Sequence, residues 1–168
     1  MIYPIKTTFL LAGMLACAAM AEPNNNSENR NAGTEGATVN VEFRIENTNG
    51  EEQQVFEPGQ TLLFVFEVQN HGDSSQRLDY TFPPHRVEVV DPQDGKPVWQ
   101  AWEGRMFAQV MRHADIAPGE SEIFSVEWQT DAQSPRGQFA VQPTFHGFLQ
   151  RDGQKLEAEL QNVSITIQ

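Results

Sequence analysis

Regular alternation of apolar and polar residues along most of the chain is the feature that most constrains its fold. From Thr38 onward, apolar side chains occupy every second position in a series of short runs. The clearest runs are 39–45, 62–68, 139–145 and 163–167. Because successive side chains of a β-strand point to opposite faces, each run predicts a strand with one buried and one exposed face. No segment has a clear helical period.

Turn signals separate these runs. They are Asn49-Gly50, Pro58-Gly59, the Pro- and Gly-containing segment 91–95, Pro118-Gly119 and Asp152-Gly153. Short strands divided by such turns at intervals of about 8–12 residues are typical of sandwich folds. The pattern predicts an all-β, immunoglobulin-like antiparallel β-sandwich of eight or nine short strands, with a small β-barrel as the alternative. A single helical turn within 105–113 is the one departure that it allows.

One predicted strand has apolar residues on both faces. After Pro118-Gly119, either Ile123 or the set Phe124, Val126 and Trp128 faces the core, since the two lie on opposite parities. The alternation alone leaves this choice open.

Composition limits the chemistry of the chain. Its 168 residues, with 11 Phe and 3 Trp, suffice for one domain with a packed core. The formal charge of −12 excludes nucleic acid as a partner, because phosphate backbones repel an acidic protein. The single cysteine permits neither an internal disulfide nor a cysteine-based zinc site.

The first residues have the pattern of an export signal. Lys6 precedes an apolar stretch over 7–18, and Ala19-Met20-Ala21 provides a small-x-small cleavage pattern. The stretch is shorter than the ~20 apolar residues that cross a bilayer. We therefore expect a signal peptide over 1–21, and an exported protein of the periplasm or cell envelope.

A second processing site competes with the first. Gly13 to Cys17 resembles a bacterial lipobox, which predicts a lipoprotein signal over 1–16 and a lipid anchor on Cys17. This anchor is the one membrane contact that we expect. The segment 22–37 is rich in Asn, Gly and Glu and has no apolar period, which predicts a flexible linker ahead of a domain over 38–168.

One segment resembles a known family. Its residues are Val98-Trp99, Trp102, Phe107-Ala108-Gln109, Pro118-Gly119-Glu120 and Trp128, preceded by the strand 65–70. Their order, over about residues 55–130, resembles the BsuPI-type intracellular proteinase inhibitor family. The resemblance implies a small immunoglobulin-like β domain that blocks a serine protease, and it carries over no reactive-site residue. The expected export differs from the intracellular location that the family's name states.

The aromatic residues of this segment also have a structural interpretation. Trp99, Trp102, Phe107 and Trp128 fill a sandwich core efficiently, because large rings bury much area. Pro118-Gly119-Glu120 then forms a tight turn. We favour the structural role for most of them.

Catalytic patterns are scarce, and we expect no enzyme. The four histidines (His71, His85, His113 and His146) are scattered and expected in solvated loops, and no serine lies in a Gly-x-Ser-x-Gly elbow. Met106, Met111 and His113 suit copper by ligand type, but core or rim methionines explain their spacing better. We therefore predict no metal and no cofactor.

Three loops have the composition of an inhibitory segment. The segment 81–86 is stiffened by two prolines and presents Arg86, and 134–137 presents Arg136. The segment 100–105 presents Trp102, Glu103 and Arg105, and is favoured because it lies within the resembling region. A rigid loop loses little entropy when it binds a cleft.

Three functions follow from these patterns. The first is an exported protein-binding domain that inhibits a serine protease through an exposed loop. The second is a non-inhibitory, immunoglobulin-like structural or assembly module that binds another envelope protein. The third is a metal or small-ligand carrier.

Overall fold

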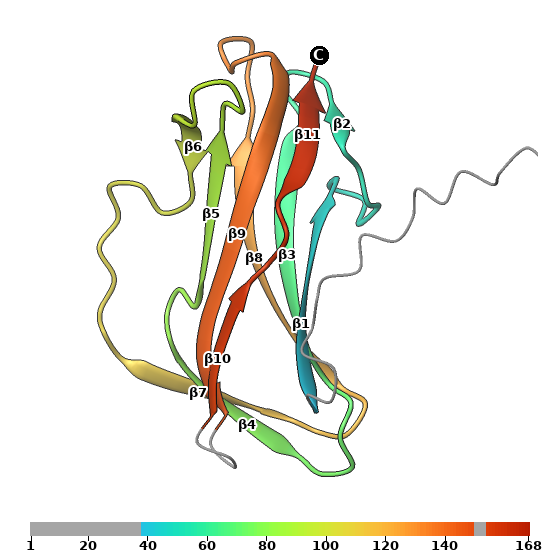
Figure 1. The fold of residues 1–168 in the computed structure, drawn as a ribbon, viewed down its shortest axis with the longest axis vertical. Coiled ribbons are helices and arrows are strands. Elements are labelled where there is room, and N and C mark those ends of the chain that lie inside the picture. Colours follow the sequence, from blue (N-terminus) through green and yellow to red (C-terminus); the bar gives the residue numbers. More distant parts are fainter. Residues whose placement is uncertain (1–37, 150–153) are drawn as a thin grey trace, which may run out of the picture.

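The computed structural model describes residues 38–149 and 154–168. This part of the chain is an all-β sandwich (Figure 1). None of its elements is a helix that could cross a membrane. The predicted signal over 1–21 or 1–16, the lipidation site at Cys17 and the linker over 22–37 lie outside the described residues.

Eleven strands are present among the described residues. They are β1 (Val39–Glu46), β2 (Val55–Phe56), β3 (Thr61–Asn70), β4 (Gln76–Thr81), β5 (His85–Val90), β6 (Pro97–Gln100), β7 (Met111–Ile116), β8 (Ser121–Gln129), β9 (Gly137–Leu149), β10 (Gln154–Glu159) and β11 (Val163–Ile167).

The strands form two sheets that are not closed into a barrel. The smaller sheet has the order β1-β3-β8, with β8 at one edge. The larger sheet is built on β9, which takes two partners in succession along each side. One side of β9 pairs with β11 and then β10; the other pairs with β5 and then β4. The sandwich prediction is therefore confirmed, and the barrel alternative is wrong.

The side of the larger sheet that contains β5 and β4 has two different edge strands. The edge strand beside β5 is β6, and the edge strand beside β4 is β7. β6 and β7 lie toward opposite ends of the molecule (Figure 1). The chain that joins them must therefore cross the open side of the sandwich.

Alternation correctly predicted the buried faces of the smaller sheet. The inward side chains of β1 and β3 are buried, namely Val39, Val41, Phe43, Ile45, Leu62, Phe64, Phe66 and Val68. In β8 the open choice falls to Phe124, Val126 and Trp128, which are buried, whereas Ile123 is 58% exposed. Their cross-strand partners explain this: Phe124 lies opposite Phe66 on the inner face.

Two strands were not predicted, and one expectation was wrong. β2 has only two residues and pairs in parallel with β11, so it is too short to show alternation. The helical turn allowed within 105–113 does not form. Instead, 105–110 has no regular structure, and β7 begins at Met111 because its backbone pairs with β4.

Aromatic stacking joins the two sheets. The Trp99 ring of β6 stacks on Phe64 with centroids 5.3 Å apart, and on Trp128 with centroids 5.4 Å apart. Trp99 thus lies between a residue of β3 and a residue of β8. The predicted structural role of these tryptophans is confirmed for Trp99 and Trp128.

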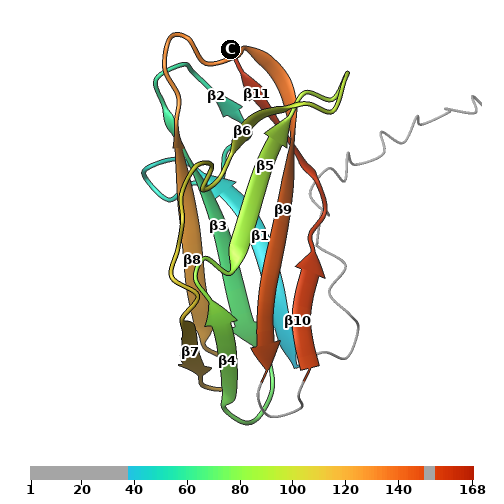
Figure 2. The same ribbon diagram turned by 90° about the vertical axis from the view of Figure 1, so that its left-hand side faces the viewer.

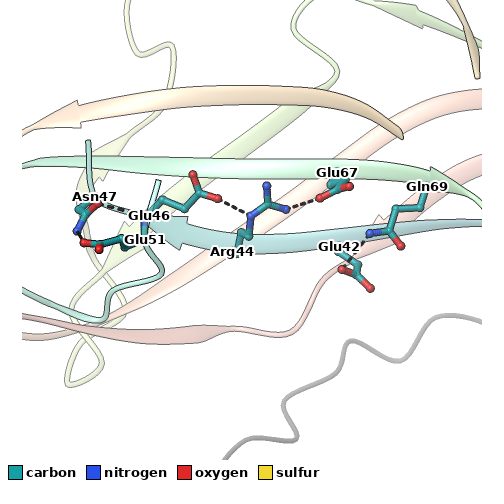
Figure 3. Close-up of polar contacts among 7 residues, drawn as sticks. All are labelled: Glu42, Arg44, Glu46, Asn47, Glu51, Glu67 and Gln69. Atoms are coloured by element: carbon teal, nitrogen blue, oxygen red, sulfur yellow. Dashed lines mark hydrogen bonds and ion pairs between the residues drawn. The ribbon is translucent and has the colours of Figure 1, made fainter. Parts of the chain in front are cut away.

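The outer face of the smaller sheet holds a short ion-pair network. Arg44 lies between Glu46 and Glu67, with nitrogen–oxygen distances of 2.5 and 2.6 Å (Figure 3). A hydrogen bond from Ser121 and the Arg44 guanidinium lower the pKa of the Glu67 carboxyl despite some burial. These charged groups remain partly exposed to solvent. We therefore expect their ion pairs to contribute little to the stability of the domain.

Removing a central core ring is expected to destabilise the domain strongly. Phe66 is fully buried, and its ring lies 5.0 Å from that of Phe43. Phe66→Ala should lower the free energy of unfolding by about 3–5 kcal/mol, measured by urea denaturation. Phe148→Ala is the matched control, because Phe148 is 47% exposed and should cost clearly less. Equal losses would contradict the assigned core.

Candidate protein-binding site

The segment 101–110 joins β6 to β7 and passes beside β8. It crosses the open side of the sandwich and stands away from the sheets (Figures 1 and 2). We call this segment the crossing loop. It has a turn at 101–104 and no regular structure over 105–110.

The turn of the crossing loop is held in an unusual backbone conformation. Trp102 has a φ of +68°, in the left-handed region that bulky residues rarely adopt. The Arg105 N–H donates to the Trp102 carbonyl at 3.0 Å and closes the turn. The Trp102 Nε1–H donates to the His85 carbonyl at 3.3 Å and ties the indole to β5. Such a conformation persists because the surrounding contacts hold it.

Three rings anchor the crossing loop to the domain. Trp102 and Phe107 lie on the loop, and Phe82 lies just before β5. Their centroids are 5.4 Å apart for Trp102 and Phe107, 5.5 Å for Phe82 and Phe107, and 5.9 Å for Phe82 and Trp102. We call these three residues the anchor cluster. The edge-to-face geometry of Phe107 against both partners is favourable for aromatic rings.

Two arginines cover the anchor cluster. The Arg105 guanidinium lies 5.9 Å from the centroid of the Trp102 ring, and that of Arg112 lies 5.0 Å from the centroid of Phe82. These cation–π contacts draw both side chains back onto the domain.

The remainder of the loop is exposed. Met106 is 98% exposed, and Val110 is 57% exposed. Within the described part of the chain, one backbone hydrogen bond lies inside 106–110, from the Val110 N–H to the Ala108 carbonyl at 2.8 Å. The loop therefore presents backbone groups and an apolar side chain to a partner, while its rings hold it in place.

A groove of about 560 Å³ lies between the turn of the loop and the edge of β8. Trp99, Trp102 and Arg105 line it on the loop side. On the β8 side it is lined by Ser125, Val126, Glu127 and Gln129.

The edge of β8 has no strand partner among the described residues on its side away from β3. The Thr130 N–H donates to the Gln60 carbonyl, and the Asn70 N–H donates to the Glu120 carbonyl. The antiparallel register therefore directs the backbone groups of Glu127 and Gln129 toward the free edge, where they border the groove.

His85 lies beneath the loop and is only 1% exposed. The centroid of its ring lies 5.0 Å from the ring centroid of Phe66, 5.6 Å from that of Trp102 and 6.2 Å from that of Phe124. Burial lowers the pKa of the imidazole from 6.5 to about 4, and the backbone of Ser125 opposes this in part. Within the described residues, neither ring nitrogen has a well-formed hydrogen bond. The expectation of a solvated loop histidine is therefore wrong for His85, because β5 carries it between the sheets.

Only part of the predicted site comes together. Trp102, Glu103 and Arg105 all line the groove. Arg86 is exposed on β5, and Arg136 lies in the turn before β9, where its Nη1 donates to the Gln168 carbonyl at 2.9 Å. Neither lines the groove, and their part in binding stays a prediction.

Sequence reasoning missed the exposed half of the loop. Met106 was weighed as a copper ligand and as a core or rim methionine, and Phe107 as a core residue and as part of the motif that resembles the family. The sequence held one signal for this half of the loop. The segment 105–110 shows no alternation of apolar and polar residues, although it ends in the apolar residue Val110. Phe82 lies in the segment 81–86, which was predicted as a separate loop, and its contact with the crossing loop depends on the fold.

The copper hypothesis gains no support from residue placement. Met106 lies on the loop, whereas Met111 and His113 lie on β7, and all three are exposed. No group of three or more His, Cys, Asp or Glu residues able to hold a metal occurs in 38–149 and 154–168.

The buried histidine predicts a specific acid sensitivity. Because the folded-state pKa lies below the unfolded value, the unfolded chain binds more protons between pH 6.5 and 4. The contribution of neutral His85 to the free energy of unfolding is complete above pH 6.5. As the pH falls toward 4 this contribution is lost, which lowers the free energy of unfolding by on the order of 3 kcal/mol. Denaturation at pH 7 and pH 5 should show a smaller pH dependence for His85→Leu than for the wild type. The exposed His113→Leu should retain the wild-type dependence, and an unchanged slope in His85→Leu would contradict the assignment.

Solved structures show only a general likeness to this fold. The CARDB domain of the PF1109 protein from Pyrococcus furiosus is 11% identical, with a TM-score of 0.40 over 78% of this chain and 90% of that one. The putative ApaA protein from Bordetella pertussis is 10% identical, with a TM-score of 0.42 over 77% and 93%. The alkylpurine DNA glycosylase AlkC from Pseudomonas fluorescens is 12% identical, with a TM-score of 0.38 over 80% of this chain but only 31% of that one. Likeness at this level has no implication for function.

The family comparison is more specific. No curated protein matches the chain at a significant level. The profile of the BsuPI family, described as "Intracellular proteinase inhibitor", matches residues 51–147, which is more than half of the chain. This range includes both strands that flank the crossing loop and the whole anchor cluster. The chain therefore belongs to the BsuPI family of proteinase-inhibitor-like domains.

Proposed function

We propose that this protein is an exported BsuPI domain that inhibits a serine protease through the crossing loop. Membership of the family supports a protease as the general class of partner. The observation that carries the finer proposal is the loop itself: an exposed segment, 105–110, anchored by Trp102 and Phe107.

The loop meets the two requirements of a protease inhibitor. A protease cleft binds extended chain through backbone hydrogen bonds, and 106–110 leaves most of its backbone groups free of bonds within the described chain. A tight inhibitor must also lose little conformational entropy on binding. The anchor cluster and the turn at Trp102 supply this rigidity without covering Met106.

Export is the second part of the proposal. It is supported by the charge at Lys6, the apolar stretch over 7–18 and Ala19-Met20-Ala21. The family description names intracellular inhibitors. An exported member would act on a protease of the cell envelope.

A second function is favoured by a different feature. The free edge of β8 and the groove beside it suit an extended segment of another protein, added as a further strand. Such a partner fits a non-inhibitory assembly module of the envelope. Capture of one defined non-protease partner, blocked by Glu127→Pro at the edge and not by changes in 105–110, would favour this function.

Inhibition tests the first function directly. The domain from residue 38 onward is mixed with subtilisin, chymotrypsin and trypsin, and a small chromogenic substrate reports activity. We expect stoichiometric loss of activity of at least one protease, with the domain intact by mass spectrometry. Phe107→Ala should weaken inhibition at least about tenfold and make the loop a cleavable substrate, since an unanchored loop leaves the cleft more readily.

Matched variants locate the binding surface. Phe148→Ala removes an exposed ring on β9, far along the chain from the loop, and should inhibit like the wild type. Arg86→Ala and Arg136→Ala examine the two other predicted loops, and loss of inhibition in either would move the site there. Normal activity of all three proteases at micromolar domain would contradict an inhibitory function.

Processing of the full chain tests export. Expression of residues 1–168 in a bacterial host, followed by fractionation and mass determination, should recover the protein outside the cytoplasm. A chain beginning at Glu22 indicates a signal peptide, and a lipid-modified chain beginning at Cys17 indicates a lipoprotein. Recovery of the unprocessed chain in the cytoplasm would contradict export.

A further inference from the structure

We propose that Met106 is the residue that enters the specificity pocket of the inhibited protease, and that the target class therefore accepts long apolar side chains. This inference rests on the proposed inhibitory function. It assigns a protease with an apolar specificity pocket. The basic residues of the predicted loops would instead have indicated a trypsin-like protease.

The direction of neighbouring side chains singles out Met106. Phe107 points back onto the domain, where it contacts Phe82 and Trp102. Its neighbour Met106 is 98% exposed, so its side chain lies in solvent and not against the domain.

Arg105 is a poorer candidate for the same role. Its guanidinium lies over the Trp102 ring at 5.9 Å, and the residue lines the groove. Binding of this side chain in a trypsin-like pocket would require it to leave the ring. Met106 has no such contact to break, because nearly all of its surface is in solvent.

The support beneath Met106 fits this role. The residue that follows it is fixed by rings on two sides, and the turn at Trp102 precedes it by four positions. An exposed side chain between two fixed points can be presented without reordering the loop. A long, unbranched apolar side chain fills a hydrophobic pocket of the chymotrypsin type and lacks the charge that a trypsin-type pocket binds.

Variants at position 106 test the assignment. With the domain from residue 38 onward, wild type should inhibit chymotrypsin or subtilisin more strongly than trypsin. Met106→Ala should raise the inhibition constant at least about 30-fold, as for a central hot-spot residue. Met106→Leu should retain most of the inhibition. Met106→Arg should lose inhibition of chymotrypsin and gain inhibition of trypsin.

Met111→Ala is the matched control, since Met111 is also exposed, at 60%, but lies on β7. It should inhibit like the wild type. Equal losses in Met106→Ala and Met111→Ala would indicate a broad apolar contact and overturn the assignment. Inhibition of trypsin alone that is abolished by Arg105→Ala would assign the pocket to Arg105.

The outcomes separate this inference from the function on which it rests. Strong inhibition that survives Met106→Ala overturns the inference and leaves an inhibitory function in place. No inhibition of any of the three proteases by the wild type overturns both. Thermal melting of each variant checks the fold, which substitution of so exposed a side chain should leave unchanged.

Discussion

Backbone pairing along β9 is the constraint on which the rest of the structure depends. This strand is 13 residues long, and each of its sides pairs with two shorter strands in succession. A long strand cannot leave its backbone groups unpaired in the core of a sheet, so β5 and β4 must lie end to end beside it. The larger sheet then ends in β6 at one level and in β7 at the other. The connection between them, over 101–110, pairs with neither sheet.

The crossing loop is consequently held by side chains rather than by a hydrogen-bond ladder. Rings of Phe82, Trp102 and Phe107 contact one another, and the Trp102 indole is tied to β5. Side-chain anchoring fixes the path of the loop but leaves its backbone groups open to a partner. Our proposals for protease inhibition depend on this combination of a fixed path and an unpaired backbone.

Much of the fold was predictable, and the site was predictable only in part. The faces of β1, β3, β9 and β11 followed from alternation, because burial on every second residue is a local property. Trp102, Glu103 and Arg105 lie together at the groove because they are adjacent in sequence, and their part in binding stays a prediction. β7, the burial of His85 and the exposure of Met106 were missed. Each depends on strands that are distant in sequence, such as β4 for β7 and β8 for His85.

The sequence by itself determined the class of fold, the positions of most strands and turns, and the family. These are local properties: the period of apolar residues, Gly where φ is positive, and the order of tryptophans around Pro118-Gly119-Glu120. Tertiary structure decided which strands became edges, and hence which side chains meet. Phe107 faces the domain and Met106 faces solvent because Phe82 lies across from the loop, 25 residues earlier in the chain than Phe107. Such pairing follows from contacts that no local pattern records.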